Sequence, residues 1–435
     1  MINYYLAIDL GASGGRHIVG HLKNGKIVFE QVYKFKTLME DSPYGLVWNH
    51  QRIFNEIKIG IKEAFKQHPN IVSLAIDAWG VDYVLMNRNK EITPCYAYRN
   101  KRNLEASERV HKIIPFSELY KLTGVQFTPI NTIYQFFADK KEGRLNEATD
   151  YLMIPSYYTY KLTGKKTHEY TDESTGSLLN PLNGKYCYSI IDRLDLPRRL
   201  FKNISLPGEY VGDLLPDIQK EVGGNCKVVL CASHDTASAF EAVNIDEDTV
   251  IISSGTWSLL GIKAPGPIIS DKTMKANYTN EGGVGYIRFL KNIMGMWINN
   301  TARSEVRLEQ AFIDSMIDQI HYKVTFDVND PSLLAPTSMK KAVLKLLEKC
   351  PPQNDLEMFA SIYHSMALSY KKAIEELEDI TGRKYKTIMI VGGGSKNKYL
   401  NKLVEELTGK KVIVDTIEAT ALGNIKVQMK ANKEL

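Results

Sequence analysis

Apolar and polar residues follow a strand-like period along the first 35 residues of the chain. Between residues 4 and 22 this pattern predicts two short apolar strands that flank a glycine-rich turn, Asp9–Arg16. A second apolar stretch, Thr249–Ile262, repeats the design around the turn Ser253–Ser258. Glycines in such turns allow backbone N–H groups to approach an anion closely. The two hairpins therefore predict a site that binds the phosphates of a nucleoside triphosphate from two sides.

Helical and strand patterns alternate through the rest of the first half. A helical pattern covers residues 53–65, and a strand with a buried character over 71–76 ends in the string Asp77–Asp82. A strand over 228–231 leads into the start of a helix. Residues 100–180 are mixed and polar with many tyrosines, so we interpret them as an insertion that forms a wall of a substrate site.

The last third of the chain has the clearest helical rhythm. Apolar residues recur at the spacing of one helix face, namely Leu356, Phe359, Tyr363, Met366, Tyr370, Ile374 and Leu377. The pattern then predicts strands over 387–391 and 412–414, and helices over 398–407 and 419–429. Alternating strands and helices, with glycine-rich turns at strand ends, are typical of an α/β fold that binds its ligands at those ends.

Length and charge limit the classes of function. A chain of 435 residues exceeds one ordinary core, so we expect two domains, 1–242 and 243–435, which resemble each other in element order. The 55 basic and 50 acidic residues are interspersed, and the net charge of +5 fits an anionic small substrate as well as a nucleic acid. We expect a small-molecule substrate, with neither a nucleic acid nor a membrane as partner. The sequence leaves the oligomeric state open.

Cysteine usage and the N-terminus bear on the cellular compartment. The five cysteines are scattered and form no CxxC pair, which indicates reduced thiols and no zinc site. The apolar residues 1–10 have no leading Lys or Arg and are interrupted by Asp9, so a signal peptide is not expected. The stretch Thr249–Ile262 is too short and too polar to span a bilayer. These features predict a soluble, cytoplasmic protein.

Neither glycine-rich turn matches a familiar phosphate motif. Asp9–Arg16 lacks GxxxxGK[ST], and it continues as a strand, whereas GxGxxG opens a helix. The alternative for this turn is an ordinary hairpin, although Asp9 at its mouth is placed to hold a metal that bridges phosphates. In the second turn Gly255 and Thr256 are the candidates for the terminal phosphates, and the alternative is a serine-rich β-turn. The three glycines at 392–394 form either a plain turn or a bare surface for adenine or ribose.

Asp235 is the candidate for catalysis. It lies between a strand end and a helix start, where N-terminal amides favour a carboxylate. As a general base it would accept the proton of an attacking sugar hydroxyl. The alternative is a helix N-cap. Trp79 and Asp82 offer an aromatic face beside a carboxylate, suited to a sugar, with core packing and a turn as the alternatives. Asn292 either bonds a hydroxyl or caps a helix.

Taken together, these strings resemble the FGGY family of carbohydrate kinases. The resemblance rests on WGVD, HDTASA, SSGTWSL, TNEGG and LKNIMG, and it extends from residue 4 to about residue 429 in the family's order. It implies a two-domain actin-like ATPase fold, of the ribonuclease H-like type, with the active site in the interdomain cleft. It also implies transfer of the γ-phosphate of ATP to the 1-hydroxyl of L-rhamnulose, with Mg²⁺.

The resemblance also implies roles for individual residues. Asp235 matches the general base, and Asp9 is the candidate that orders Mg²⁺ through water. The implied ATP contacts are Ala12, Ser13, Gly14, Gly15, Arg16, Thr256, Asn300 and Gly393. The implied sugar contacts are Gly80, His234, Asp235, Thr236 and Asn292.

Several departures from the family pattern stand beside these matches. Gly14 replaces a usual Ser, Ala78 a usual Thr and Asn100 a usual Asp, and family members generally continue for several dozen residues beyond the region of Gln428. Two alternatives stay open. One is a kinase for another ketose such as L-fuculose. The other is a non-catalytic ATP-binding protein of the actin and chaperone type, which has no need of a sugar-facing carboxylate.

Overall fold

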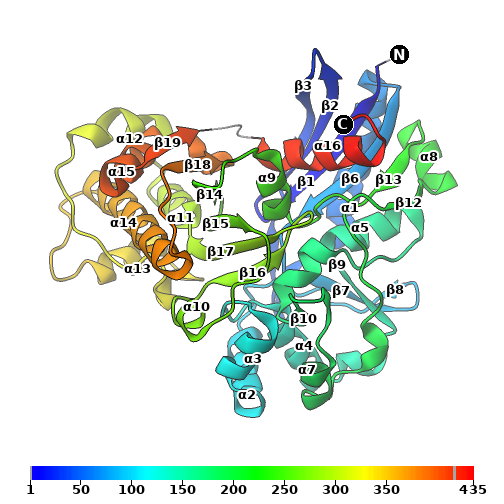
Figure 1. The fold of residues 1–435 in the computed structure, drawn as a ribbon, viewed down its shortest axis with the longest axis horizontal. Coiled ribbons are helices and arrows are strands. Elements are labelled where there is room, and N and C mark those ends of the chain that lie inside the picture. The colour runs from blue at the N-terminus through cyan, green and yellow to red at the C-terminus, as the bar shows by residue number, and fades with distance from the viewer. Residues whose placement is uncertain (1, 415–417) are drawn as a thin grey trace. The chain divides into compact units, whose positions relative to one another are not determined.

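The computed structural model describes residues 2–414 and 418–435, and its fold is α/β (Figure 1). The chain forms two compact units. The first consists of Met1–Val243, Lys263–Phe289 and Ala419–Leu435, and the second of Asn244–Ile262 and Leu290–Glu418. The boundary expected after residue 242 lies next to Val243, where the chain first leaves the first unit for the second. Two later segments, including the C-terminal helix, return to the first unit, and a single boundary does not describe them.

The first unit is built on a six-stranded sheet. Its strand order is β12-β13-β6-β1-β2-β3, with bounds β1 Tyr4–Gly11, β2 Gly14–Lys23, β3 Lys26–Phe35, β6 Ile71–Ala78, β12 Tyr210–Asp213 and β13 Lys227–Val229. Strand β1 pairs antiparallel with β2, so the predicted N-terminal hairpin is confirmed. It pairs in parallel with β6, so the carboxyl ends of these two strands meet at one edge of the sheet.

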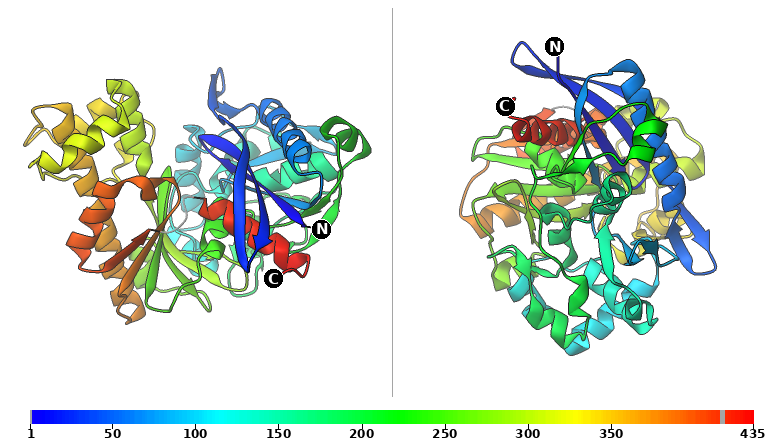
Figure 2. Two further views of the ribbon diagram at one scale, coloured as in Figure 1. Left: turned by 90° about the horizontal axis from the view of Figure 1, so that it is seen from above. Right: turned by 90° about the vertical axis from the view of Figure 1, so that its right-hand side faces the viewer.

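Two helices cover the two faces of this sheet. Alternate residues of β1, such as Leu6 and Ile8, share a buried core with the apolar face of α1 (His50–Gln67). The intervening residues, such as Ala7, pack with Ile425 and its neighbours on α16 (Ala419–Ala431). Figure 2 shows α16, in red, lying across the blue N-terminal strands. Successive residues of β1 therefore face opposite sides of the sheet, and both sides are buried, one by α1 and the other by α16.

Helix α16 also packs closely against α9 (Asp235–Ala242). A Cβ atom added to Gly423 would lie 1.8 Å from the backbone oxygen of Ser238 on α9. Only glycine permits so close an approach of the two helices. The last helix of the chain thus packs against the helix whose first residue is Asp235.

Residues 100–180, expected to be a polar insertion, share a buried core with the segments on either side of them in the first unit, while α5 (Ile154–Thr163) packs into the core of the six-stranded sheet. The elements of this region, with those segments, are β7 Tyr83–Asn87, β8 Lys90–Glu91, α2 Arg102–Ile113, α3 Phe116–Thr123, α4 Thr132–Lys141, β9 Asp150–Met153, α5 Ile154–Thr163, α6 Tyr170–Glu173, β10 Leu179–Asn180, β11 Lys185–Tyr186 and α7 Tyr188–Arg193. Its tyrosines are largely buried in aromatic pairs, for example Tyr83 stacked on Phe136 at a ring-centroid distance of 4.6 Å. The tyrosine-rich composition therefore reflects core packing.

A second six-stranded sheet repeats the hairpin design. Its order is β16-β17-β15-β14-β18-β19, with bounds β14 Thr249–Ser254, β15 Trp257–Ala264, β16 Thr279–Gly282, β17 Ile287–Met294, β18 Thr387–Val391 and β19 Lys411–Val414. Strand β14 pairs antiparallel with β15 and parallel with β18, which confirms the second predicted hairpin. On α14 (Asp355–Thr381) every residue of the predicted apolar face except Leu356 is buried.

The other helices and strands complete the two units. They are β4 Met39–Ser42, β5 Gly45–Trp48, α8 Pro216–Val222, α10 Asp271–Lys275, α11 Met296–Val306, α12 Gln310–Met316, α13 Met339–Leu346 and α15 Lys398–Thr408. Within the described ranges, no helix is both long enough and apolar enough to cross a membrane. All five cysteines lie in these ranges and are free thiols.

Candidate active site

The first glycine-rich turn is a tight connection between β1 and β2. Gly11 pairs with Gly14, which leaves Ala12 and Ser13 as the two turn residues, with Ser13 exposed. A Cβ atom on Gly15 would lie 2.4 Å from the ring of Phe35, so the glycine is needed for packing against β3. The structure thus brings Ala12, Ser13 and the following glycines together at one open turn.

Two carboxylates lie side by side below this turn. Asp9 on β1 and Asp77 on β6 are partners in the parallel register, and both are buried. The Asp9 carboxylate forms an ion pair with Arg16, which is its partner on β2. Asp77 accepts a hydrogen bond of 2.5 Å from the amide of Asn424, while its Oδ1 has no hydrogen-bond partner among the described residues. Burial and the charge of Asp9 raise the pKa of Asp77 well above its ordinary range.

Asp235 joins this group from the neighbouring chain segment. The backbone N–H of Ala78, at the end of β6, donates to the carbonyl of Ser233 over 2.8 Å, which holds the start of α9 beside the sheet edge. The N-cap of α9 is His234, and Asp235 is the first helical residue. The N-cap alternative therefore does not apply to Asp235. Its side chain is 30% exposed, so it faces a space that a ligand can reach.

The contacts of Asp235 orient its carboxylate. Its Oδ1 accepts hydrogen bonds from the backbone N–H of Thr236 at 2.6 Å and from the Thr236 hydroxyl at 3.1 Å. The same oxygen lies 3.4 Å from Nε2 of His234. These contacts all involve Oδ1, so none of them occupies the second oxygen. Burial and the nearby Asp9 raise the pKa of Asp235, and His234 opposes the shift. A raised pKa suits a general base that works near neutral pH.

Gly80 lies beside the side chains of His234, Thr175 and Asp172. A Cβ atom added to it would lie 3.2 Å from Nε2 of His234, 3.2 Å from the Thr175 methyl and 3.3 Å from Oδ1 of Asp172. The absence of a side chain therefore keeps only the position next to Nε2 of His234 clear. The structure brings together the predicted sugar contacts Gly80, His234, Asp235 and Thr236.

The sugar-facing interpretation of Trp79 and Asp82 is corrected by the structure. Both side chains are buried. Asp82 accepts hydrogen bonds from the indole N–H groups of Trp48 at 2.6 Å and Trp79 at 3.0 Å, and from Gln135. The two indoles lie against each other with centroids 4.3 Å apart. The core-packing alternative is the one that holds, and Asp82 ties the WGVD string to the core.

The second glycine-rich turn, in the second unit, is anchored by its carbonyl groups. The carbonyl of Gly255 accepts from the N–H of Met296 at 2.9 Å, and that of Thr256 accepts from the N–H of Trp297 at 3.2 Å. Both donors lie in the first turn of α11. A Cβ atom on Gly295 would lie 2.8 Å from the Gly255 oxygen, which explains the glycine that ends LKNIMG. The hairpin turn and the start of α11 thus form one rigid element.

The three consecutive glycines pack on the same hairpin. Cβ atoms on Gly392 and Gly394 would lie 2.9 Å and 2.0 Å from the backbone oxygen and the hydroxyl of Ser254. Gly393 between them is exposed and faces open space. Two glycines therefore serve packing and one is open to a ligand. Asn300 is exposed on α11, and Asn292 lies on β17. Thr256, Gly393, Asn300 and Asn292 are all residues of the second unit.

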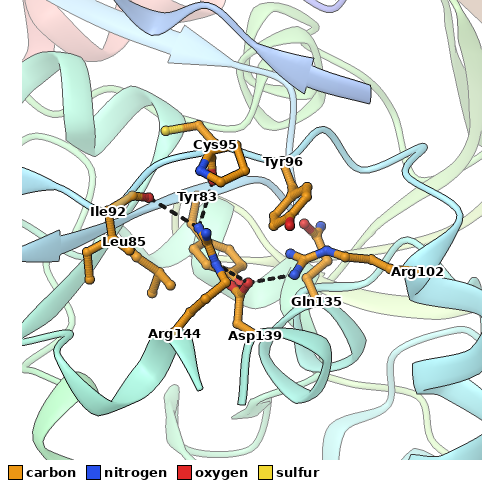
Figure 3. Close-up of a pocket in the computed structure, with 10 residues that line it drawn as sticks. Tyr83, Leu85, Ile92, Cys95, Tyr96, Arg102, Gln135, Asp139 and Arg144 are labelled. Atoms are coloured by element: carbon orange, nitrogen blue, oxygen red, sulfur yellow. Dashed lines mark hydrogen bonds and ion pairs between the residues drawn. The ribbon is translucent and has the colours of Figure 1, made fainter. Parts of the chain in front are cut away.

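A separate small cavity lies in the insertion region of the first unit (Figure 3). Asp139 lies between Arg102 and Arg144 there, at 2.6 Å from Nη1 of Arg102 and 2.8 Å from Nε of Arg144. The Arg102 guanidinium lies over the ring of Tyr96. These charges satisfy one another, and none of the predicted site residues lines the cavity. We interpret it as structural.

Several buried polar residues around the site were missed at the sequence level. They are Asp172, Glu281, Arg288, Asn424 and Gln428. Arg288 interrupts an apolar strand, and Asn424 and Gln428 lie four residues apart in an otherwise apolar helix segment. A charged or amide side chain inside such a pattern is the signal that could have identified Arg288, Asn424 and Gln428.

Comparisons with known proteins agree with this architecture. The model of the N-terminal domain of the FGGY family of carbohydrate kinases matches residues 4–240, and that of the C-terminal domain matches residues 250–432. The chain belongs to the FGGY family of carbohydrate kinases. It is thus a sugar kinase, a phosphotransferase that uses ATP, and its α/β fold is that of the actin-like ATPases.

Relatives of this FGGY kinase match along nearly the full chain. A protein named Rhamnulokinase from Oceanobacillus iheyensis is 40% identical, over 98% of this chain and 93% of its own. One of the same name from Halalkalibacterium halodurans is 39% identical, over 100% of this chain and 95% of its own. Among solved structures, ligand-bound xylulose kinase from Lactobacillus acidophilus has a TM-score of 0.82 at 17% identity, covering 99% of this chain and 90% of its own. Plasmodium falciparum glycerol kinase with ADP has a TM-score of 0.78 at 13% identity, covering 100% and 90%.

Proposed function

We propose that this FGGY kinase transfers the γ-phosphate of ATP to the 1-hydroxyl of L-rhamnulose, giving L-rhamnulose 1-phosphate and ADP in L-rhamnose catabolism. The observation that carries the proposal is the 40% identity, along 98% of the chain, to a protein named Rhamnulokinase. The partly exposed carboxylate of Asp235, with His234 beside it, supports the proposal, because a sugar kinase needs a base that the sugar hydroxyl can reach. The free thiols support a cytoplasmic location.

Asp235 is the proposed general base. The second oxygen of Asp235 accepts the proton of the sugar 1-hydroxyl. At the same time the hydroxyl oxygen of the sugar bonds to the γ-phosphorus, and the bond between this phosphorus and the oxygen that bridges it to the β-phosphate breaks. His234 and Thr236 fix the Asp235 carboxylate and bind neighbouring sugar hydroxyls, beside the space at Gly80. Asn292 is proposed as a further sugar contact. Positioning and charge neutralisation supply most of the rate enhancement.

The phosphates are proposed to bind at the two glycine-rich turns. Ala12 to Arg16 and Thr256 supply backbone and side-chain donors, while Gly393 and Asn300 contact the nucleoside. Mg²⁺, when bound, neutralises phosphate charge. Asp9 and Asp77 fit such an ion, because the Oδ1 of Asp77 lacks a partner in the part of the chain that the structure describes. Among the described residues, no group of three or more His, Cys, Asp or Glu is placed to hold a metal ion. Mg²⁺ in kinase sites commonly keeps several water ligands beside one or two carboxylates and the substrate phosphates.

The sugar preference is tested by ADP release with a panel of ketoses and aldoses. We expect kcat/KM to be highest for L-rhamnulose. A higher value for L-fuculose or D-xylulose would contradict the proposed substrate while leaving the kinase activity in place. Slow ATP hydrolysis with no response to any sugar would contradict the kinase function itself.

A further inference from the structure

Arg288 is a fully buried arginine on β17, within the first unit. Its Nε donates to the carbonyl of Gly282 at 2.7 Å, and its Nη2 donates to the carbonyl of Thr171 at 3.1 Å. Its Nη1 lies 3.1 Å from Oε2 of Glu281 and 3.0 Å from Nδ1 of His234. The guanidinium is thus fixed on several sides, with one nitrogen aimed at the imidazole that borders the proposed base.

The contact between Arg288 and His234 sets the protonation of the imidazole. A guanidinium only donates hydrogen bonds and keeps its proton in proteins. Nδ1 of His234 must therefore accept, so the proton of the neutral ring lies on Nε2. The Nε2 atom is the one that lies 3.4 Å from Oδ1 of Asp235 and borders the space at Gly80.

Glu281 holds Arg288 in place. Burial disfavours its charge, but Arg288 outweighs that effect and lowers the pKa of Glu281, so the carboxylate stays ionised. Glu281 lies 3.6 Å from Nδ1 of His234, farther than the 3.0 Å of the arginine nitrogen. Without Arg288, this carboxylate would draw the imidazole proton to Nδ1. The buried ion pair thus selects one tautomer over the other.

We propose that Arg288 and Glu281 are positioning residues of the phosphoryl transfer, which hold His234 as the neutral tautomer protonated on Nε2. In this state His234 donates to Oδ1 of Asp235 or to a sugar hydroxyl and cannot compete as a base. The hydroxyl proton therefore goes to Asp235. The proposal rests on the proposed role of Asp235 as the general base. It adds how the neighbouring His234 is kept in the tautomer that leaves Asp235 to accept the proton.

Acidic groups make this control necessary. His234 faces Asp235 on α9, Glu281 on β16 and, across Gly80, Asp172 on α6. Neither oxygen of Asp172 finds a hydrogen-bond partner within the described ranges. Asp9 and Asp77 face Asp235 from β1 and β6. Against these carboxylates, Arg288 places a hydrogen-bond donor 3.0 Å from Nδ1 of His234.

The tautomer can be read directly by ¹⁵N NMR of histidine-labelled full-length protein at neutral pH, with the signal of His234 assigned by its loss in His234→Gln. We expect an unprotonated Nδ1 and a protonated Nε2. In Arg288→Met we expect the proton on Nδ1, or on both nitrogens. A proton on Nδ1 in the unmodified protein, or no change in the variant, would overturn the proposal. This measurement uses neither sugar nor nucleotide, so its outcome is independent of which sugar the enzyme phosphorylates.

A double-mutant cycle separates tautomer control from a purely structural role. Gln at position 234 donates from its amide and has no tautomers. We expect Arg288→Met to lower kcat with L-rhamnulose by about 10- to 100-fold in the His234 background, the size seen when a partner that orients a functional imidazole is lost. In the His234→Gln background the same change should have little further effect on kcat. An equal loss in both backgrounds would overturn the proposal. If Arg288→Met fails to fold, the NMR result on the unmodified protein decides.

Discussion

At the scale of single residues, the decisive feature is that Asp235 is partly exposed while the carboxylates beside it are buried. Asp77 and Asp9 lie in the sheet edge, whereas Asp235 begins a helix and keeps one oxygen clear of its own contacts. The environments of these three acids thus differ, in agreement with the different roles proposed for them. Asp235 is suited to proton transfer. The buried carboxylates of Asp9 and Asp77 are suited to hold a cation that neutralises the charge of the phosphates.

Asp235→Asn should lower kcat by about 10²- to 10⁴-fold, because an amide cannot accept the hydroxyl proton. ATP binding should be unchanged, as measured by titration calorimetry with a non-hydrolysable analogue. Asp271→Asn is the matched control, since Asp271 also lies in the first turn of a helix and is exposed. Wild-type turnover in Asp235→Asn would contradict the role of this residue.

Gly80→Ala tests the space beside His234. The added methyl would lie 3.2 Å from Nε2 of His234 and from the Thr175 methyl, tighter than ordinary contact. We expect KM for the sugar to rise by about 10-fold, equivalent to about 1.4 kcal/mol, with KM for ATP unchanged. Gly266→Ala is the control, because its Cβ would meet no atom of the described residues within 4 Å. An unchanged sugar KM would exclude this space from the sugar site.

At the scale of elements, α16 contributes a buried row of amides to the first sheet. Asn424 donates to Asp77, and Gln428 donates to Oδ1 of Asn424 at 2.7 Å and to the carbonyl of Leu6 at 3.0 Å. Ser73 on β6 donates to Gln428 at 2.7 Å. The helix thus supports the carboxylate pair through a continuous chain of hydrogen bonds from a segment far away in sequence.

Asn424→Ala should lower the free energy of unfolding by about 1.5–3 kcal/mol, because Asp77 and Gln428 would lose their buried partner. Denaturant unfolding followed by circular dichroism measures the change. Asn432→Ala, about two turns later, just past the end of α16 and only partly buried, should cost less than about 1 kcal/mol. If the two variants lost the same free energy of unfolding, the hydrogen bond from Asn424 to Asp77 would not be an exceptional contribution to stability.

The sequence predicted the elements whose signal is local. The hairpins β1–β2 and β14–β15 and the buried face of α14 follow from periods of two and 3.6 residues. Trp79 and Asp82 were misread because their partner Trp48 is far away in sequence, and only the fold brings its indole to Asp82. The roles of Arg288 and Asn424 likewise depend on long-range packing, which composition and spacing do not carry.

At the scale of the whole molecule, the chain does not divide into two consecutive halves. The α/β class follows from the alternation of elements, as predicted, whereas two domains were expected from the length of the chain alone. The return of Lys263–Phe289 and Ala419–Leu435 to the first unit had no local signal. It brings Glu281, Arg288 and Asn424 to residues that come from the first half.

The stability of the whole chain should depend on pH through His168. This buried residue lies 2.9 Å from Glu173 and 3.2 Å from Asp150. Burial alone would lower the pKa of His168, but the two hydrogen bonds outweigh it and raise the pKa to about 9. Because the folded pKa exceeds the unfolded value of about 6.5, the stabilisation is complete below pH ~6.5 and is lost as pH rises through ~9.

This loss should amount to about 3 kcal/mol, because the pKa of His168 is about 9 in the folded protein and about 6.5 in the unfolded chain. The free energy of unfolding, measured at steps from pH 6 to 10, should therefore differ between the wild type and His168→Gln at low pH and converge at high pH. A difference that stays constant across this range would contradict the ionised state of His168.

The most direct test of the central claim follows the phosphorus atom itself. The protein is incubated with ATP, Mg²⁺ and L-rhamnulose, and the products are observed by ³¹P and ¹³C NMR. We predict a new phosphate ester coupled to carbon 1 of the sugar, formed in step with ADP and absent on the same timescale with Asp235→Asn. Inorganic phosphate as the only new phosphorus product beside ADP, or an ester at another carbon, would contradict the account.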